Sequence, residues 1–282
     1  MPLFVIVGLL GVVTGFLSGL LGIGGGIIMA PLLLYVPPLF GCAPLPMQTV
    51  AGLTIVQGLA ACISGGLTHT RHHFLSPSLV LWMGITLFAS SFIGGASAGH
   101  IDNSHLLLVF AIMAFVAAVL IALPKRKEAE YPDLAHFSFN RLRALAVSVV
   151  VGFFGGLVGQ GGSFILIPLM TVFVKVPTRI AIGSNLAIVF LSTLAALLGK
   201  ALTAQIDWPL TLPIVATVLP AAHLGASLSR RVRVDTLRII LAVCIGLAAL
   251  RIGLTALLLA ELKRNETPSQ GWQLCGFTTS EL

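Results

Sequence analysis

The chain alternates between long apolar stretches and short polar segments. Asp, Glu, Lys and Arg are absent before Arg71, and charge-free runs follow at 72–101, 103–124, 144–174, 180–199 and 208–229. A helix needs about 20 apolar residues to cross a hydrocarbon core, and each run is long enough. The pattern predicts an all-α polytopic membrane protein. The expected helical segments are 3–21, 24–36, 47–68, 78–98 and 104–123 in the first half, and 141–158, 161–174, 178–200, 208–229 and 235–260 in the second.

Composition supports this fold class. The 282 residues are 57% hydrophobic and 9% charged, whereas soluble globular proteins carry about 25% charged residues. These values exclude a soluble globular protein and a disordered one. The formal net charge is +7, but the cations lie between apolar runs, where membrane topology accounts for them. We therefore expect a lipid bilayer as the environment and no nucleic-acid partner.

The two halves of the chain are copies of one unit. Residues 15–33 read GFLSGLLGIGGGIIMAPLL, and residues 152–170 read GFFGGLVGQGGSFILIPLM. At an offset of 137 the identical positions are Gly15, Phe16, Gly19, Leu20, Gly22, Gly24, Gly25, Ile28, Pro31 and Leu32. After the loop 36–46 the offset becomes 131, so that Pro46 matches Pro177 and Gly52 matches Gly183. We interpret the chain as a first transmembrane repeat (1–123), a polar cytoplasmic linker (124–143), a second repeat (144–262) and a polar C-terminal tail (263–282).

Two topologies are compatible with the segments 24–36 and 161–174, which are short and follow glycine clusters. Each cluster either kinks one long crossing or turns the chain back as a hairpin. The hairpin topology places twelve cations on one side and three on the other, whereas the single crossing divides them nine to six. Cytoplasmic segments are enriched in Lys and Arg. The charge pattern favours hairpins, and with them two inverted repeats of five segments each, with both termini outside.

The glycine clusters are candidate anion sites. A helix that restarts inside a membrane presents N–H groups without intrahelical partners, and its dipole favours negative charge. Transporters with inverted repeats direct such broken helices at anionic substrates. The residues expected to supply backbone donors are Gly24, Gly25, Gly26, Gly161, Gly162 and Ser163. Ser163 stands where the first repeat has Gly26, so the two half-sites differ chemically.

Polar residues in the neighbouring segments are candidates for setting selectivity. They are Thr54, Gln57, Gln160, Ser184 and Asn185. An interhelical hydrogen bond is the alternative for each of them. Small hydroxyls such as those of Thr54 and Ser184 are often satisfied on their own helix. Amide side chains are costlier in lipid and point more strongly to a polar cavity.

Other polar residues leave alternatives open. His69 and Lys200 align at the offset of 131, and both can anchor a helix end or line an anion path. Arg251 lies in an apolar segment and can be functional or interfacial. We expect no metal site and no cofactor. The sequence holds no catalytic triad, HExxH motif, paired carboxylates or P-loop, which argues against an enzyme and against drive by an ATPase domain of this chain.

The duplicated motifs GLLGIGGGIIMAPLL and GLVGQGGSFILIPLM, with PMQTVAG and its copy PTRIAIG, resemble the sulfite exporter TauE/SafE family. Gln205-Ile206-Asp207-Trp208 before a helix adds to the match. The resemblance implies a multi-pass permease of the plasma (inner) membrane that moves small sulfur-containing anions, often outward. We therefore expect a secondary transporter of sulfite or an organosulfonate. The alternatives are an anion channel and a membrane-embedded accessory subunit. The sequence identifies no coupling ion, and a homodimer remains one of the open oligomeric states.

Overall fold

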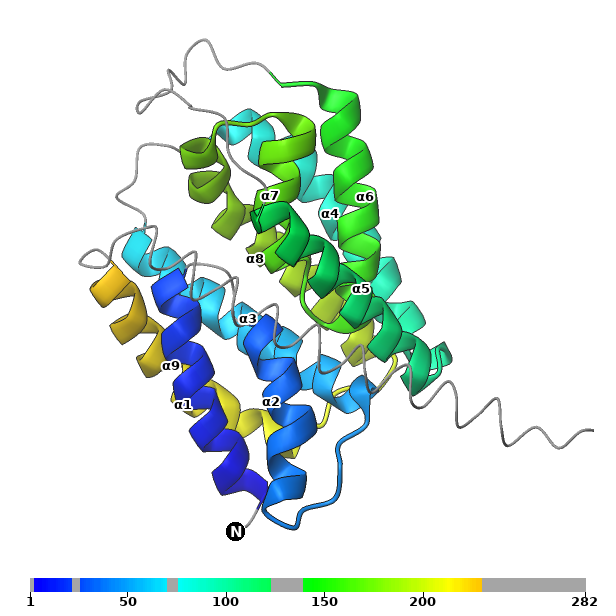
Figure 1. The fold of residues 1–282 in the computed structure, drawn as a ribbon, viewed down its shortest axis with the longest axis vertical. Coiled ribbons are helices and arrows are strands. Elements are labelled where there is room, and N and C mark those ends of the chain that lie inside the picture. The colour runs from blue at the N-terminus through cyan, green and yellow to red at the C-terminus, as the bar shows by residue number, and fades with distance from the viewer. Residues whose placement is uncertain (1–2, 22–25, 70–75, 123–138, 230–282) are drawn as a thin grey trace, which may run out of the picture.

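The structure is a computed structural model, and it describes residues 3–21, 26–69, 76–122 and 139–229. Regular structure within these residues is entirely helical (Figure 1). The elements are α1 (Leu3–Leu21), α2 (Gly26–Leu39), α3 (Met47–His69), α4 (Pro77–Ser97), the 3₁₀ turn η1 (Ala98–His100), α5 (Asn103–Ala122), α6 (Arg141–Val158), α7 (Ser163–Leu169), the π-helical turn η2 (Met170–Val174), α8 (Thr178–Leu202) and α9 (Trp208–Ser229).

The helices match the expected segments closely. In the described part of the chain, seven of them are long and apolar enough to cross a membrane, and α2 and the α7–η2 unit are shorter apolar helices. The chain is thus a multi-pass helical membrane protein, as the apolar runs predict. The segment expected at 235–260 lies outside the described residues, and the division into repeats, linker and tail stays a prediction.

The glycine cluster of the second repeat reverses the chain. Gly159, Gly161 and Gly162 have φ values of 77°, 58° and 73°, a left-handed conformation that glycine adopts without steric cost. A Cβ atom built on Gly162 would overlap Val151, so α7 begins against the side of α6. The chain therefore forms a hairpin here rather than one long kinked crossing.

The first repeat has the same local arrangement where it is described. Helices α1 and α2 pack together, and the Thr14 hydroxyl of α1 donates a hydrogen bond to the Met29 sulfur of α2 at 3.2 Å. The turn between these helices, with Gly24 and Gly25, lies outside the described residues. Helix α2 packs against α1 and α3, and α7 packs against α5, α6 and α8. Each short helix thus contacts the helix that precedes it in the chain, as in a hairpin.

The two repeats exchange their first helices. Helix α1 packs along α9 of the second repeat, and α6 packs along α4 of the first (Figure 1). A Cβ atom on Gly19 would overlap the carbonyl oxygen of Ala222, and one on its counterpart Gly156 would overlap that of Ser91. Since Ala222 and Ser91 are also equivalent at the offset of 131, the same close contact occurs twice. Only glycine allows the helix backbones to approach this closely.

The register of these contacts gives the helix directions. Along α1, Gly8 faces Pro213 of α9 and Gly15 faces Val218 further on. Contacts thus advance in the same direction on both helices, so α1 and α9 run parallel. The Gly152 and Gly156 contacts with α4 advance in the same way, so α4 and α6 also run parallel. Whether the repeats cross a membrane in opposite orientations stays a prediction.

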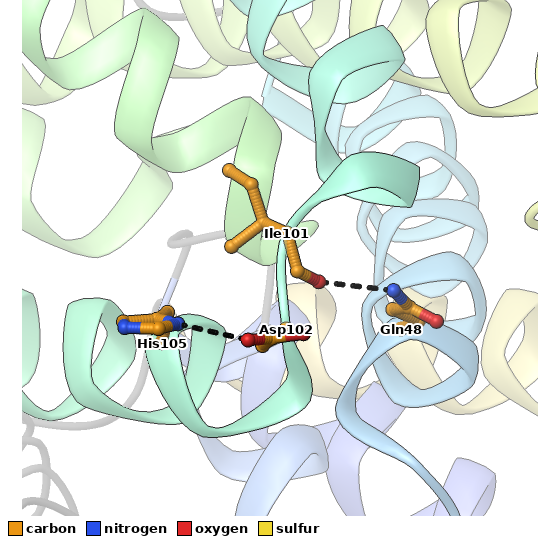
Figure 2. Close-up of polar contacts among 4 residues, drawn as sticks. All are labelled: Gln48, Ile101, Asp102 and His105. Atoms are coloured by element: carbon orange, nitrogen blue, oxygen red, sulfur yellow. Dashed lines mark hydrogen bonds and ion pairs between the residues drawn. The ribbon is translucent and has the colours of Figure 1, made fainter.

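The start of α3 is fixed by the segment between α4 and α5. The Gln48 side-chain amide donates to the Ile101 carbonyl oxygen at 3.0 Å (Figure 2). The Met47 N–H donates to the side-chain oxygen of Asn103. Asp102 and His105 form a mostly exposed pair at 3.6 Å beside them. These contacts hold one end of the helix that carries Thr54 and Gln57.

Candidate functional site

The turn at residues 159–162 is the centre of the candidate site, and its backbone is partly bonded to itself. The N–H groups of Gln160 and Gly161 both donate to the Gly155 carbonyl oxygen, at 2.8 and 3.1 Å. The Ser163 N–H donates to the Gln160 carbonyl oxygen at 3.2 Å. In this conformation the backbone of Gly161 and Ser163 is therefore occupied within the turn, which differs from the expectation that both present free N–H donors.

Other N–H groups at the start of α7 remain without acceptors. The first helical hydrogen bond of α7 is the one that the Leu166 N–H donates to the Gly162 carbonyl oxygen, at 3.1 Å. The N–H groups of Gly162, Phe164 and Ile165 have no hydrogen-bond acceptor among the described residues. These are the groups that a helix start leaves unsatisfied. The unpaired backbone donors in this conformation are those of Gly162, which was among the predicted donors, and of Phe164 and Ile165, which were not.

Helix α3 of the first repeat supports this turn of the second. The Thr54 hydroxyl lies 3.1 Å from the Gly159 carbonyl oxygen and 3.2 Å from that of Ala51 in its own helix. A Cβ atom on Gly159 would overlap the Ala51 carbonyl oxygen, so turn and helix are in close contact. Thr54 therefore connects the two repeats. Its hydroxyl makes the interhelical hydrogen bond that we considered as the alternative to a role in selectivity.

Gln160 links the same turn to the start of α2. Its Nε2 donates to the Gly26 carbonyl oxygen at 2.9 Å, and a Cβ atom on Gly26 would overlap its Oε1. The structure thus brings together α2, α3 and the turn before α7. Of the sequence-predicted residues, Gly26, Thr54, Gln57, Gln160, Gly161 and Gly162 belong to these elements, and Ser163 begins α7 directly after the turn.

Two serines that sequence reasoning missed hold the other side of the turn. The Ser192 hydroxyl of α8 donates to the Gly161 carbonyl oxygen at 2.9 Å. It lies 2.5 Å from the Ser91 hydroxyl of α4, which also bonds the Gly152 carbonyl oxygen at 3.0 Å. At the offset of 131 their counterparts are Ala222 and Ala61. A hydroxyl in one repeat where the other has alanine is a difference that could have identified both serines from the sequence.

Four predicted residues share an unusual property: they are buried and incompletely hydrogen-bonded. Among the residues that the structure describes, Gln57 and Asn185 have no partner for either amide atom, Gln160 has none for Oε1, and Ser163 has none for its hydroxyl. All four side chains are at most 2% exposed. Leaving such a group unsatisfied costs about 1–3 kcal/mol. Ser18, which was not predicted, is the other described residue in this class.

Ser184 has a structural partner instead. Its hydroxyl accepts a hydrogen bond from the Ser76 N–H at 3.2 Å, and Ser76 is the N-cap of α4. Eight residues of helix separate Ser184 from Ser192, about 12 Å along the axis. Ser184 therefore lies away from the turn, and Asn185 is still about 10 Å along the axis from Ser192. This asparagine occupies in α8 the position that Thr54 has in α3.

The electrostatics of the region are set by few charges. Among the described residues the carboxylates are Asp102 and Asp207, both at helix ends. Lys200 is fully buried; its Nζ lies 3.2 Å from the Leu157 carbonyl oxygen and 3.2 Å from the Gln205 side-chain oxygen. The side chain of His69, and Arg251, lie outside the described set. Neutral donors thus dominate the site, with one cation nearby.

Comparisons with known proteins point to one family. A family model described as sulfite exporter TauE/SafE matches residues 7–252. "Probable membrane transporter protein YunE" of Bacillus subtilis (strain 168) is 26% identical over 84% of this chain and 93% of its own length. A "Probable membrane transporter protein" of Xylella fastidiosa (strain 9a5c) is 29% identical over 78% and 83%. "Probable membrane transporter protein MJ0441" of Methanocaldococcus jannaschii is 25% identical over 89% and 94%. No solved structure matches the chain.

Proposed function

Because the chain belongs to the sulfite exporter TauE/SafE family of membrane transporters, we propose that its substrate is a small sulfur-containing oxyanion, such as sulfite or an organosulfonate. Transport is secondary and outward across the plasma membrane. The observation that carries the proposal is a set of buried polar atoms without a partner among the described residues: both amide atoms of Gln57 and of Asn185, the Gln160 Oε1 and the Ser163 hydroxyl. Proteins keep such groups at a cost in stability when a ligand uses them.

The chemistry of these groups suits an oxyanion. The unpaired donors in the described part of the chain are the Gln57 and Asn185 amide nitrogens, the Ser163 hydroxyl and the N–H groups of Gly162, Phe164 and Ile165. The unpaired amide oxygens of Gln57, Gln160 and Asn185 are acceptors and have to face away from an anion. A sulfite or sulfonate presents three oxygens that accept several such bonds at once, and bonds to a charged acceptor are stronger than those between neutral groups. The described membrane-spanning helices carry no carboxylate to solvate a cation. The donor set therefore favours anions over amines and metal cations.

The arrangement of the helices is compatible with alternating access. Helix α4 runs parallel to α8, because Ser91 lies against Ser192 and Gly95 against Ala196. Helices α8 and α9 are joined by the short segment 203–207, and each is long enough to cross a membrane, so they run in opposite directions. With α1 parallel to α9 and α6 parallel to α4, these directions support the proposal that α1 and α6 begin inverted repeats (Figure 1). Inverted repeats with a site between them are a recurrent transporter design.

A channel with the same site would pass anions without a change of conformation, so the test has to separate the two. Purified protein in liposomes loaded with unlabelled sulfite should accumulate labelled sulfite by counterflow, and the flux should saturate. Sulfonates should compete, while ammonium compounds and divalent cations should not. Flux that never saturates, without counterflow, would indicate a channel. Absence of any oxyanion flux would contradict the proposed substrate.

A further inference from the structure

Lys200 is a buried cation that the proposed binding site does not include. Its side chain is fully covered by protein, although it stands in the last turn of α8. The ammonium group is therefore covered by protein and does not extend into solvent or lipid. No carboxylate lies within ion-pair distance of it in the described part of the chain. Asp207, the nearest in sequence, accepts from the Leu210 N–H at the start of α9.

The partners of Lys200 are neutral oxygens. Nζ donates to the Leu157 carbonyl oxygen and to the Gln205 side-chain oxygen, both at 3.2 Å. An ammonium group has three N–H donors and no acceptor, so one donor is left without a described partner. The positive charge is therefore not cancelled by a negative side chain.

The position of Leu157 shows what this charge does. Leu157 is in the last turn of α6, directly before the turn 159–162. The carbonyl oxygens of a last turn lack intrahelical partners, and they form the negative end of the helix dipole, equivalent to roughly −0.5 elementary charge. That negative end lies beside the start of α7, where we place the anion. Unless it is offset, it repels the substrate.

We propose that Lys200 sets the charge of the anion site, by neutralising the α6 C-terminus and adding a net positive charge beside the turn 159–162. This inference rests on the proposed oxyanion transport. In it, Lys200 makes the electrostatic potential at the site more positive and does not contact the anion. A purely structural lysine would cap the ends of α6 and α8 and would affect all ligands equally. The two roles differ in how they depend on ligand charge.

The experiment measures binding of methanesulfonate, a monoanion, and of sulfate, a dianion, both in mildly acidic buffer, where the Lys200 ammonium keeps its proton. Isothermal calorimetry would be run on the full-length protein in detergent, for the wild type, Lys200→Gln and Lys200→Arg. Coulomb energy is proportional to ligand charge, so the fold loss for the dianion is the square of that for the monoanion: about tenfold and about a hundredfold in Lys200→Gln. Lys200→Arg keeps the charge and should keep both affinities.

A second variant keeps the lysine in place. In Gln205→Glu a carboxylate replaces the amide whose oxygen accepts from Nζ, so the cation is paired without being removed, while the bond from Nε2 to the Gly95 carbonyl oxygen is lost. The same charge-dependent loss is expected, which keeps the inference testable if Lys200→Gln fails to fold. Equal losses for the two anions, or none, in the folded variants would overturn the role of Lys200. Failure of the wild type to bind either anion would instead contradict the proposed function.

Discussion

Gln160 and Gly26 are 134 residues apart in the chain, and the Gln160 Nε2 donates to the Gly26 carbonyl oxygen at 2.9 Å. Gln160 belongs to the turn before α7, and Gly26 begins α2. The contact therefore joins the helix break of the second repeat to the short helix of the first. With the Thr54–Gly159 contact it places the candidate site between the repeats rather than inside one of them.

Gly26→Ala should disturb the site without disturbing the fold. The added Cβ overlaps the Gln160 side chain, which must move and give up its bond to Gly26. We expect oxyanion affinity to fall about tenfold, since an unpaired buried amide costs about 1–3 kcal/mol. Gly8→Ala is the matched control, because its Cβ would meet side-chain atoms at ordinary distances of 3.7 and 3.8 Å. Unchanged binding in Gly26→Ala would remove Gly26 and Gln160 from the site.

Gly19→Ala and Gly156→Ala test the exchange of helices between the repeats. Each Cβ would overlap a backbone carbonyl oxygen, of Ala222 and Ser91 respectively, and backbone cannot move aside as a side chain can. We expect each substitution to destabilise the protein by about 1–3 kcal/mol, seen as a lower unfolding temperature in detergent. If the two contacts are equivalent, the two losses should be similar. Unaltered unfolding temperatures would show that these helices do not pack as described.

Ser91 and Ser192 should be coupled in stability. Their hydroxyls contact each other and bond the carbonyl oxygens of Gly152 and Gly161. Such bonds average about 0.6 kcal/mol in membrane proteins. A double-mutant cycle of Ser91→Ala and Ser192→Ala should give a coupling energy of that size. Strictly additive effects would mean that the two serines act independently on the turn.

Topology can be tested by labelling single cysteines in a background without the native ones. Ala43 is exposed in the segment between α2 and α3, and the inverted-repeat hypothesis places it outside the cell. Glu128 lies in the linker expected in the cytoplasm. Ala43→Cys should react with an impermeant reagent in intact cells, and Glu128→Cys only after lysis. Labelling of both from the same side would contradict the predicted topology.

The helices were predictable because the apolar runs are long and their boundaries carry glycine or charge. Several boundaries differ by one or two residues, and a larger difference is that the segment expected to end at residue 36 continues as α2 to Leu39, through Pro37 and Pro38. Prolines read as a helix stop because they remove backbone donors, yet here they lie in the last turn. The exchange of α1 and α6 between the repeats was not predictable. It depends on which helices the glycines of α1 and α6 contact, and the spacing of apolar residues along the chain does not identify the partner of a helix.

The residues of the candidate site that could be predicted were the amide side chains within apolar segments. Gln57, Gln160 and Asn185 stood out because amides are costly in apolar helices. Ser91 and Ser192 did not, because hydroxyls commonly bond their own helix. The N–H groups of Gly161 and Ser163 are bonded within the turn because of its left-handed geometry, which the sequence did not reveal, while the Gly162 N–H has no acceptor among the described residues. The binding role of all these residues stays a prediction. Gly24 and Gly25 keep their predicted role only as a hypothesis, because they lie outside the described residues.

The central claim is that buried polar groups are kept without partners because a substrate anion uses them. The most direct measurement compares thermal unfolding and sulfite binding in Gln57→Leu, alone and combined with Asn185→Leu. Replacing unsatisfied amides by apolar side chains of similar size should leave the unfolding temperature unchanged or raise it. At the same time, sulfite should no longer stabilise or bind the protein. Wild-type sulfite affinity in the double variant would contradict the claim, as would a large loss of stability with affinity retained.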